Sequence, residues 1–216
     1  IEDDRTANTA LYFDGASVIG PIGDEASIGT SESKDDRTIE LWFKPMSDGA
    51  NQGLITFGGD TGSSTYGTLA WQGGESGDPV HLYAGGGSPE AGESKGSFPP
   101  FVWHHVAVTR SDNTWRLFLN GTAENTRTGL AHTIVTSSQN QLTLGCRPDT
   151  STQFLNGYID DLRITVGEAR YTSNFTAPTT AHLTSAGDAN KQIIVNSSAD
   201  GVDVGTGGIN QARIAK

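Results

Sequence analysis

The sequence predicts an all-β sandwich, and three observations support this. Apolar residues alternate with polar ones in many short runs, which is the period of a β-strand. Turn-forming residues separate these runs, and glycine alone supplies 28 of the 216 residues. No segment of helical length repeats its apolar residues every 3.6 positions. Many short strands joined by turns are typical of two packed antiparallel sheets.

The run from Thr38 to Lys44 shows the strand pattern most clearly. Its residues Ile39, Leu41 and Phe43 share one face, and the residues between them share the other. Residues 103–110 and 115–121 form a similar pair, and their short polar connection predicts an antiparallel hairpin. The further expected strands are residues 10–13, 53–58, 68–72, 79–84, 141–145 and 157–164. Trp42, Trp103 and Trp115 are expected in the core.

The composition excludes several classes of protein. Lys and Arg number 14 against 25 Asp and Glu, a net charge of -11, and no basic cluster is present for binding nucleic acid. No apolar run approaches the ~18–20 residues of a membrane span. The first residues lack the basic end and apolar stretch of a signal peptide. Cys146 is the single cysteine, which excludes an internal disulfide and a cysteine-based zinc site.

The residue composition of the sequence changes near Pro178. Residues 10–178 are expected to form one domain, preceded by an N-terminal arm at residues 1–9. Residues 179–216 are small and polar, with one apolar patch at residues 192–195. Such a C-terminal extension cannot bury a core of its own. We therefore expect it to dock on the domain or on a neighbouring chain, where the apolar patch can add a strand to a sheet edge.

Four segments together resemble a known family. They are residues 11–15, 38–45, 103–121 and 154–164, and the last continues to Pro178. In this order they resemble the laminin-G-like branch of the concanavalin A-like lectin/glucanase superfamily, and the ending at residues 169–178 is similar to that of bacteriophage structural proteins. The resemblance implies a two-sheet antiparallel jelly-roll sandwich with a C-terminal extension. It also implies a virion component or an adhesion module.

No catalytic constellation is expected. Glucanases of this superfamily place two carboxylates on one strand face, ~5–5.5 Å apart in retaining enzymes, whereas the equivalent strand here offers Glu40 alone. Asp160 and Asp161 are consecutive and are expected to face opposite sides of a strand. The same holds for His104 and His105, so they cannot chelate one ion, and no Ser/His/Asp triad is legible.

Calcium is the metal ion that the resemblance implies, as a structural cofactor. Related domains hold one calcium ion with an aspartate near the first strand and one near the last, and the matching positions are Asp14, Asp160 and Asp161. Acidic, glycine-rich loops supply the oxygen ligands that calcium prefers. The alternative is that Asp14 makes an Asp-Gly turn and that one of the other aspartates accepts hydrogen bonds.

A sugar site is expected around the glycine-rich loop. Sugars stack their C–H faces on aromatic rings and exchange hydrogen bonds with planar polar side chains, and the candidates for both are Tyr66, Trp71, Gln72, His81 and Tyr83. The alternative is that the aromatic residues are half-buried fillers of strand surfaces.

The leading hypothesis is a non-enzymatic structural protein of a phage virion, namely a head decoration, knob or tail-fibre component. It would lie at the virion surface, with other virion proteins or identical subunits as partners in a homo-oligomer and with cell-surface glycan as a further partner. The first alternative is an extracellular lectin or adhesin domain of a secreted bacterial protein. The second is a polysaccharide hydrolase. Nucleic-acid binding and membrane insertion are not expected.

Overall fold

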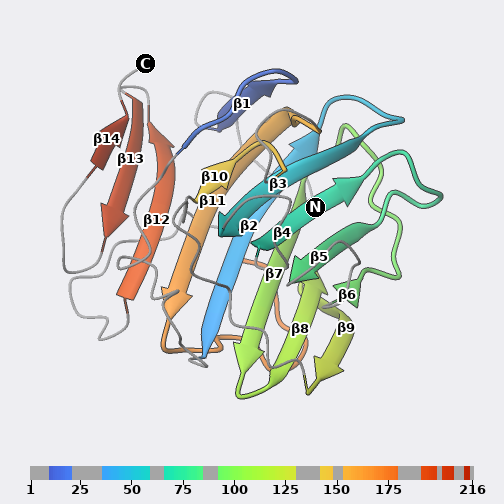
Figure 1. Cartoon of the computed structure of the whole chain (residues 1–216), viewed down its shortest axis with the longest axis vertical. Helices are drawn as coiled ribbons and strands as arrows, with labels where there is room; N and C mark the ends of the chain where they lie inside the picture. Colours follow the sequence, from blue (N-terminus) through green and yellow to red (C-terminus); the bar gives the residue numbers. More distant parts are fainter. Residues whose placement is uncertain are drawn as a thin grey trace.

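The computed structural model describes residues 10–20, 36–58, 66–84, 92–129, 142–147, 153–179, 191–198, 201–206 and 212–214. Within these ranges all regular structure is β-strand, and the strands form two antiparallel sheets packed face to face as a jelly-roll sandwich (Figure 1). The predicted fold class is therefore confirmed. In the described part of the chain, no helix is long and apolar enough to cross a membrane.

The larger sheet has nine strands among the described residues. Eight of them run in the order β14-β13-β12-β11-β2-β7-β8-β9, and β1 pairs with β11 beside them. The bounds are β1 Leu11–Asp14, β2 Arg37–Pro45, β7 His104–Ser111, β8 Thr114–Leu119, β9 Thr122–Thr128, β11 Asn156–Val166, β12 Lys191–Ser198, β13 Gly201–Thr206 and β14 Ala212–Ile214. Figure 1 shows β12, β13 and β14 at the left edge of this sheet.

The smaller sheet has five strands in the described ranges, in the order β10-β3-β4-β5-β6. Their bounds are β3 Asn51–Gly58, β4 Tyr66–Gln72, β5 Val80–Ala84, β6 Gly92–Glu93 and β10 Thr143–Leu144. This sheet lies in front of the larger one in Figure 1. Its edge strand β6 contacts β8 and β9, so the two sheets approach each other along this side of the sandwich.

The core fills the space between the two sheets, as the alternating sequence pattern predicts. Ile39, Leu41 and Phe43 of β2 are all buried in one apolar cluster, together with Trp71 and Trp115 from opposite sheets. Fully burying a large apolar side chain contributes about 1.5–3 kcal/mol. One apolar face for each sheet is enough for such a core, which explains how a chain with only 34% hydrophobic residues forms it.

Strand β11 pairs with two different strands along one of its edges. Its residues 156–159 pair with β1, and residues 162–166 pair with β12 of the C-terminal extension. On the opposite edge, the register with β2 shifts between Asp160 and Arg163, and Asp161 takes a left-handed φ of 49°. The expectation that Asp160 and Asp161 simply alternate between the two faces was wrong. Ile159 and Leu162 on either side of them both lie in the core although they are three positions apart, and the β-bulge at the aspartates makes this possible.

Residues 167–179, which we call the strap, cross the outer face of the larger sheet. The indole nitrogen of Trp42 donates to the carbonyl of Pro178 at 3.1 Å, and the hydroxyl of Thr109 donates to the carbonyl of Tyr171 at 2.8 Å. The rings of Tyr171 and Phe175 stack with their centroids 3.5 Å apart. The strap therefore covers part of this face, including Trp42 and Thr109.

Only one of the three tryptophans expected in the core lies between the sheets. Trp115 belongs to the core cluster, whereas Trp42 is buried on the outer face against the strap. Trp103 is half-buried, and its ring lies beside that of Tyr158 on the outer face. The expectation was wrong for the half-buried Trp103, whereas Trp42 is buried but outside the inter-sheet cluster. Phe43 and His104 point inward, so alternation turns both tryptophans outward.

Candidate functional site

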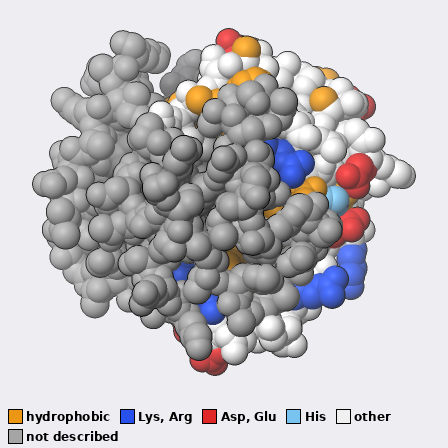
Figure 2. Space-filling model, viewed as in Figure 1, with side chains coloured by type: hydrophobic (Ala, Val, Ile, Leu, Met, Phe, Trp, Pro, Cys, Tyr) orange, Lys and Arg blue, Asp and Glu red, His pale blue; other side chains and the backbone are white. Residues whose placement is uncertain are grey.

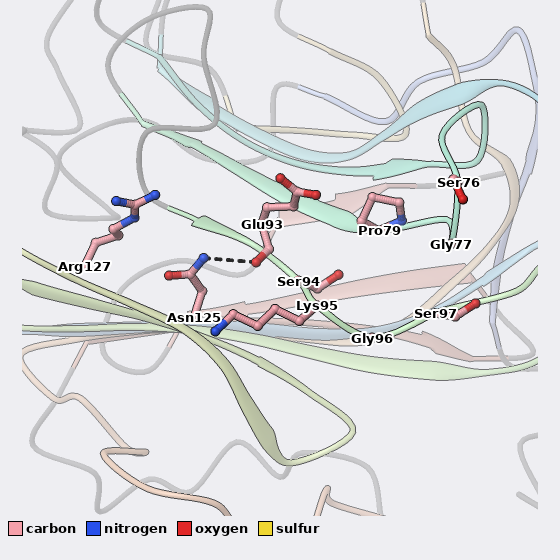
Figure 3. Close-up of a pocket in the computed structure, with 10 residues that line it drawn as sticks. All are labelled: Ser76, Gly77, Pro79, Glu93, Ser94, Lys95, Gly96, Ser97, Asn125 and Arg127. Carbon is pink, nitrogen blue, oxygen red and sulfur yellow. Dashed lines mark hydrogen bonds between the residues drawn. The ribbon is translucent and has the colours of Figure 1, made fainter.

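A pocket of about 450 Å³ opens where the edge strand β6 of the smaller sheet meets the edge strand β9 of the larger one (Figure 3). This volume lies within the range of small-molecule sites, about 300–1,000 Å³. The lining residues are Ser76, Gly77, Pro79, Glu93, Ser94, Lys95, Gly96, Ser97, Asn125 and Arg127. Most of these residues are polar, and none is aromatic, so the pocket suits a hydrogen-bonding ligand.

Two cations and an amide reach the pocket from different parts of the chain. Lys95 follows β6, whereas Asn125 and Arg127 lie on β9 (Figure 3). The amide nitrogen of Asn125 donates to the backbone carbonyl of Glu93 at 3.0 Å, which ties the two edge strands together. Among the described residues, neither Lys95 nor Arg127 has a carboxylate partner. The lining therefore presents two cations that form no ion pair with a described carboxylate, together with the one carboxylate of Glu93.

Glu124 holds one wall of the pocket in place. Its carboxylate oxygen Oε2 accepts hydrogen bonds from the backbone N–H groups of Lys95 and Gly96, at 2.9 and 3.0 Å. Hydrogen bonds to an ionised acceptor are about twice as strong as neutral ones. The segment that carries Lys95 is thus fixed by a side chain of β9 rather than left as a free loop.

A hydrogen-bonded cluster on the outer face of the smaller sheet adjoins the pocket. The amide of Gln72 donates to the hydroxyl of Tyr83 at 3.1 Å, and Nδ1 of His81 lies 3.1 Å from the same hydroxyl. Nε2 of His81 lies 3.7 Å from the carboxylate of Glu75 and 3.8 Å from that of Glu93, which also lines the pocket. Figure 2 shows acidic and basic side chains close to a histidine on this side of the molecule.

The sequence-predicted sugar residues are only partly brought together. Gln72, His81 and Tyr83 form the cluster just described, but each is at most 7% exposed. The guanidinium of Arg147 lies 4.7 Å from the ring centroid of Tyr83, so this ring already has a partner. The ring of Tyr83 is therefore buried against Arg147, and it lies beside the pocket rather than in its lining.

The remaining two predicted sugar residues lie elsewhere. Trp71 is fully buried in the core, and its indole nitrogen donates to the carbonyl of Phe98 at 2.9 Å. Its ring presents no face to a ligand, which corrects the prediction that it contacts sugar. Tyr66 begins β4, and its side chain lies outside the described residues.

The sequence-based search missed the charged lining of the pocket. Asn125 and Arg127 lie on β9, whose residues show no apolar alternation that would have revealed a strand. Lys95 lies between the expected strands at residues 79–84 and 103–110, shortly after the two-residue strand β6. The available signal was the polar composition of residues 122–128 directly after the predicted hairpin, because an exposed edge strand needs no apolar face.

The three aspartates expected to bind calcium do not form one site in the described part of the chain. Asp14 lies opposite Asn156 in the β1–β11 ladder, and Asp160 follows four residues later, on the order of 13 Å along the strand. The backbone N–H of Ala16 donates to Asp14 at 2.9 Å, and this bond holds the pKa of Asp14 below its usual value. No group of three His, Cys, Asp or Glu residues within the described ranges is placed to hold a metal ion. Calcium binding stays a prediction.

Glu40, the one carboxylate that matched a glucanase position, is held away from solvent. Its side chain is fully buried, and it accepts hydrogen bonds from Nε of Arg163 at 2.8 Å and from the hydroxyl of Tyr171 at 2.9 Å. Because the strap supplies Tyr171, a substrate cannot reach Glu40 without displacing it.

Comparison with known proteins assigns the family. The family model Laminin_G_3, described as the Concanavalin A-like lectin/glucanases superfamily, matches residues 20–168. The chain belongs to this superfamily. The resemblance inferred from the sequence is thereby confirmed at the level of the superfamily. No curated protein matches the sequence of this superfamily member.

Solved structures of the same fold include two sugar-binding domains and an enzyme. The CBM40 domain of the Ruminococcus gnavus IT-sialidase matches with a TM-score of 0.60 and 15% identity, over 76% of this chain and 92% of that one. Domain 4 of an extracellular arabinanase from Geobacillus stearothermophilus, in complex with arabinotriose, matches with a TM-score of 0.52 and 20% identity, over 73% and 70%. A leech intramolecular trans-sialidase matches with a TM-score of 0.59 and 14% identity, over 96% and 37%. These low identities show a shared fold alone.

Proposed function

We propose that this superfamily member is a non-catalytic carbohydrate-binding module that holds an acidic sugar in the pocket between β6 and β9. The observation that carries the proposal is the pair of cations Lys95 and Arg127, which have no carboxylate partner among the described residues, beside the amide of Asn125. A guanidinium matches a carboxylate with two parallel hydrogen bonds, and an ammonium supplies a second positive charge. The serine hydroxyls of the lining can then exchange hydrogen bonds with sugar hydroxyls.

The structural neighbours support sugar as the ligand class. The Ruminococcus gnavus domain has been solved bound to α2,3-sialyllactose, and it matches in that form with a TM-score of 0.57. Sialyllactose carries a carboxylate, which is the group that the two cations of this pocket would neutralise. The arabinanase domain holds arabinotriose, a neutral sugar. Together they favour the lectin-like alternative over the virion component as the function of this chain.

The lining of the pocket supports binding without hydrolysis. Cleavage of a glycosidic bond by the common mechanisms needs two carboxylates, ~5–5.5 Å apart in retaining enzymes and ~6.5–9.5 Å apart in inverting ones. Among the described residues, the pocket lining contains one carboxylate, Glu93, which also faces His81, and no tyrosine of the kind that sialidases use as nucleophile. A single carboxylate on the rim suits recognition of sugar hydroxyls.

An extracellular location follows from the proposed ligand, because acidic glycans are displayed on cell surfaces and secreted polymers. The virion surface, a homo-oligomer and partners among virion proteins rest on the sequence resemblance alone. They stay predictions beside the proposed sugar-binding function.

Isothermal titration calorimetry with 3′-sialyllactose and lactose tests this function. We expect the acidic trisaccharide to bind more tightly than lactose, and Lys95→Ala and Arg127→Ala each to weaken that binding by roughly tenfold, which corresponds to about 1.4 kcal/mol. Arg116→Ala is the matched control, because Arg116 lies on β8 outside the pocket lining.

Three results would count against the proposal. Equal affinity for the two sugars would exclude carboxylate recognition. Unchanged affinity in both pocket variants would show that the sugar binds outside this pocket. Release of free sialic acid from 3′-sialyllactose would show catalysis.

A further inference from the structure

The larger sheet carries a row of aromatic side chains that do not belong to the pocket lining. Tyr12 of β1 lies opposite Tyr158 of β11, and Tyr158 lies opposite Lys44 of β2. The pairing of Phe43 with His104 places Trp103 next to Lys44. We call Tyr12, Tyr158 and Trp103 the aromatic row.

The row faces outward from the sandwich. Leu11 and Phe13 on either side of Tyr12 are in the core cluster, as is Ile159 next to Tyr158. Alternation along the strands therefore turns both tyrosines to the outer face. The strap covers this face as far as Trp42, and Tyr12 in the aromatic row is 59% exposed.

The rings lie at the separation of successive units in a chain rather than in one stack. The centroids of Tyr12 and Tyr158 are 5.1 Å apart, and those of Tyr158 and Trp103 are 6.2 Å apart. The planes meet at 46° and 50°, so the row is twisted. Each spacing is comparable with the length of one pyranose ring. A twisted line of ring faces fits a flexible sugar chain better than a flat crystalline surface.

Further exposed apolar residues lie just after β2 and just before β7, at the end of the larger sheet where β2 finishes and β11 begins (Figure 1). Four of the five exposed large hydrophobic side chains in the described ranges are Tyr12, Met46 just after β2, and Phe101 and Val102 just before β7. Phe101 has a left-handed φ of 70°, and its N–H donates to the carbonyl of Pro45 at 2.7 Å. A bulky residue in this conformation is a strained one, and such strain is concentrated at functional sites.

The size and chemistry of this surface favour a sugar over a protein partner. A standard protein interface buries about 800 Å² on each side, whereas this patch has six side chains and Tyr158 and Trp103 are half-buried. Polar groups border every ring, with Lys44 inside the row and Asp14 and Asn156 opposite each other in the next register position. Alternating ring faces and hydrogen-bonding groups match the C–H faces and hydroxyls of a glycan.

We propose that the aromatic row is a second glycan-binding surface, which stacks an extended chain of neutral pyranose units on the outer face of the larger sheet, outside the proposed acidic-sugar pocket. This surface is distinct from the pocket in place, in chemistry and in the class of sugar that it takes. It also gives a role to the aromatic rings on the outer face, whereas the described lining of the pocket contains none.

Calorimetry and affinity electrophoresis with cellohexaose, xylohexaose and chitohexaose test the row. We expect at least one of these neutral chains to bind, and Tyr12→Ala and Trp103→Ala each to weaken it by roughly tenfold. Tyr12→Phe keeps the ring and should keep the affinity within about twofold, since stacking needs no hydroxyl. Val18→Ala, which removes an exposed apolar side chain outside the row, is the control. Melting curves of each variant confirm that the fold is intact.

Several outcomes would overturn the row as a glycan site. They are the absence of binding to all three hexasaccharides and unchanged affinity in both alanine variants. Loss of hexasaccharide binding in an Arg127→Ala variant would also overturn it, because it would show that the hexasaccharide binds in the pocket. A dimer in sedimentation velocity that Tyr12→Ala dissociates would assign the surface to a second copy of the chain. Binding of 3′-sialyllactose is measured on the same samples, so failure of the row and failure of the pocket are distinguishable.

Discussion

Glu40 illustrates how a single buried charge shapes the stability of this domain. Its carboxylate is fully buried, is bonded to Arg163 and Tyr171, and lies 3.3 Å from Nε2 of His105. Removing one partner of a buried ion pair costs about 3–5 kcal/mol, because the other charge stays behind without compensation. We expect Glu40→Ala to lower the free energy of unfolding by that amount in urea denaturation.

An exposed ion pair on the strap provides the control for Glu40. The carboxylate of Glu168 lies 3.4 Å from the guanidinium of Arg170, and the Glu168 side chain is 41% exposed. Ion pairs of this kind contribute about 0–1 kcal/mol, so Glu168→Ala should change the free energy of unfolding little. Equal losses in the two variants would contradict the account given for Glu40.

His104 gives the domain a predicted sensitivity to acid. Its ring is 5% exposed and lies between Phe43 and Phe98, with centroids 5.5 Å from each. Burial lowers the pKa of His104, and its hydrogen bond to the carbonyl of Pro99 opposes this more weakly. The unfolded chain takes up this proton near pH 6.5 and the folded chain at lower pH, so stability is present above about 6.5 and falls as pH decreases.

Urea denaturation at pH 7.5 and 5.5 measures this effect. We expect the wild-type free energy of unfolding to fall between the two values, and His104→Gln to reduce the fall, since glutamine does not titrate. An identical fall in both proteins would assign the acid sensitivity to other groups.

At the scale of elements, the strap depends on a close approach at Gly121. This glycine has a φ of +81°, and its carbonyl accepts a hydrogen bond from the N–H of Phe175 at 2.9 Å. A Cβ at this position would collide with the carbonyl oxygen of Phe175. Gly49 has nearly the same φ, +80°, but no atom lies within 4 Å of an added Cβ.

These two glycines form a matched pair for a stability measurement. Gly49→Ala should cost about 1–2 kcal/mol, the cost of a left-handed conformation for a residue with a Cβ. Gly121→Ala should cost more, because it carries the same backbone cost and also displaces the strap. Equal changes in chemical denaturation would show that the strap moves aside without loss.

The sequence predicted those strands whose two faces differ in polarity. β2, β7 and β8 bury one face in the core, so their apolar residues alternate visibly. β9 was missed, because it is an edge strand of exposed or half-exposed residues held by backbone pairing with β8. The bulge in β11 was missed as well, since a shift of register depends on the partner strand.

The candidate sites were less predictable than the strands. Gln72, His81 and Tyr83 were chosen for their residue types, and they do lie together beside the pocket. The cations of the pocket come from segments that are about 30 residues apart in sequence, and only the meeting of two sheet edges brings them together. The aromatic row depends on the register of four neighbouring strands, which no local pattern encodes.

At the scale of the whole molecule, the acidic charge is unevenly distributed along the chain. The C-terminal extension, residues 179–216, carries three acidic and three basic residues, so the net charge of -11 belongs to the first 178 residues. Removing the extension therefore leaves the long-range electrostatic self-repulsion of the molecule unchanged. A change in association after truncation would then report on the exposed sheet edge rather than on charge.

A chain ending at Thr179 tests what the extension does. All residues of the core cluster lie between Leu11 and Ile164, so we expect the shortened chain to keep a cooperative thermal transition. It loses β12, which pairs with residues 162–166 of β11, and an unpaired edge of this kind recruits other strands. Sedimentation velocity should show association that increases with concentration in the shortened chain and less in the full chain. If the shortened chain does not fold, the extension is an integral part of the domain. The reverse result, a full-length oligomer that truncation reduces to a monomer, would support the assembly role expected from the sequence.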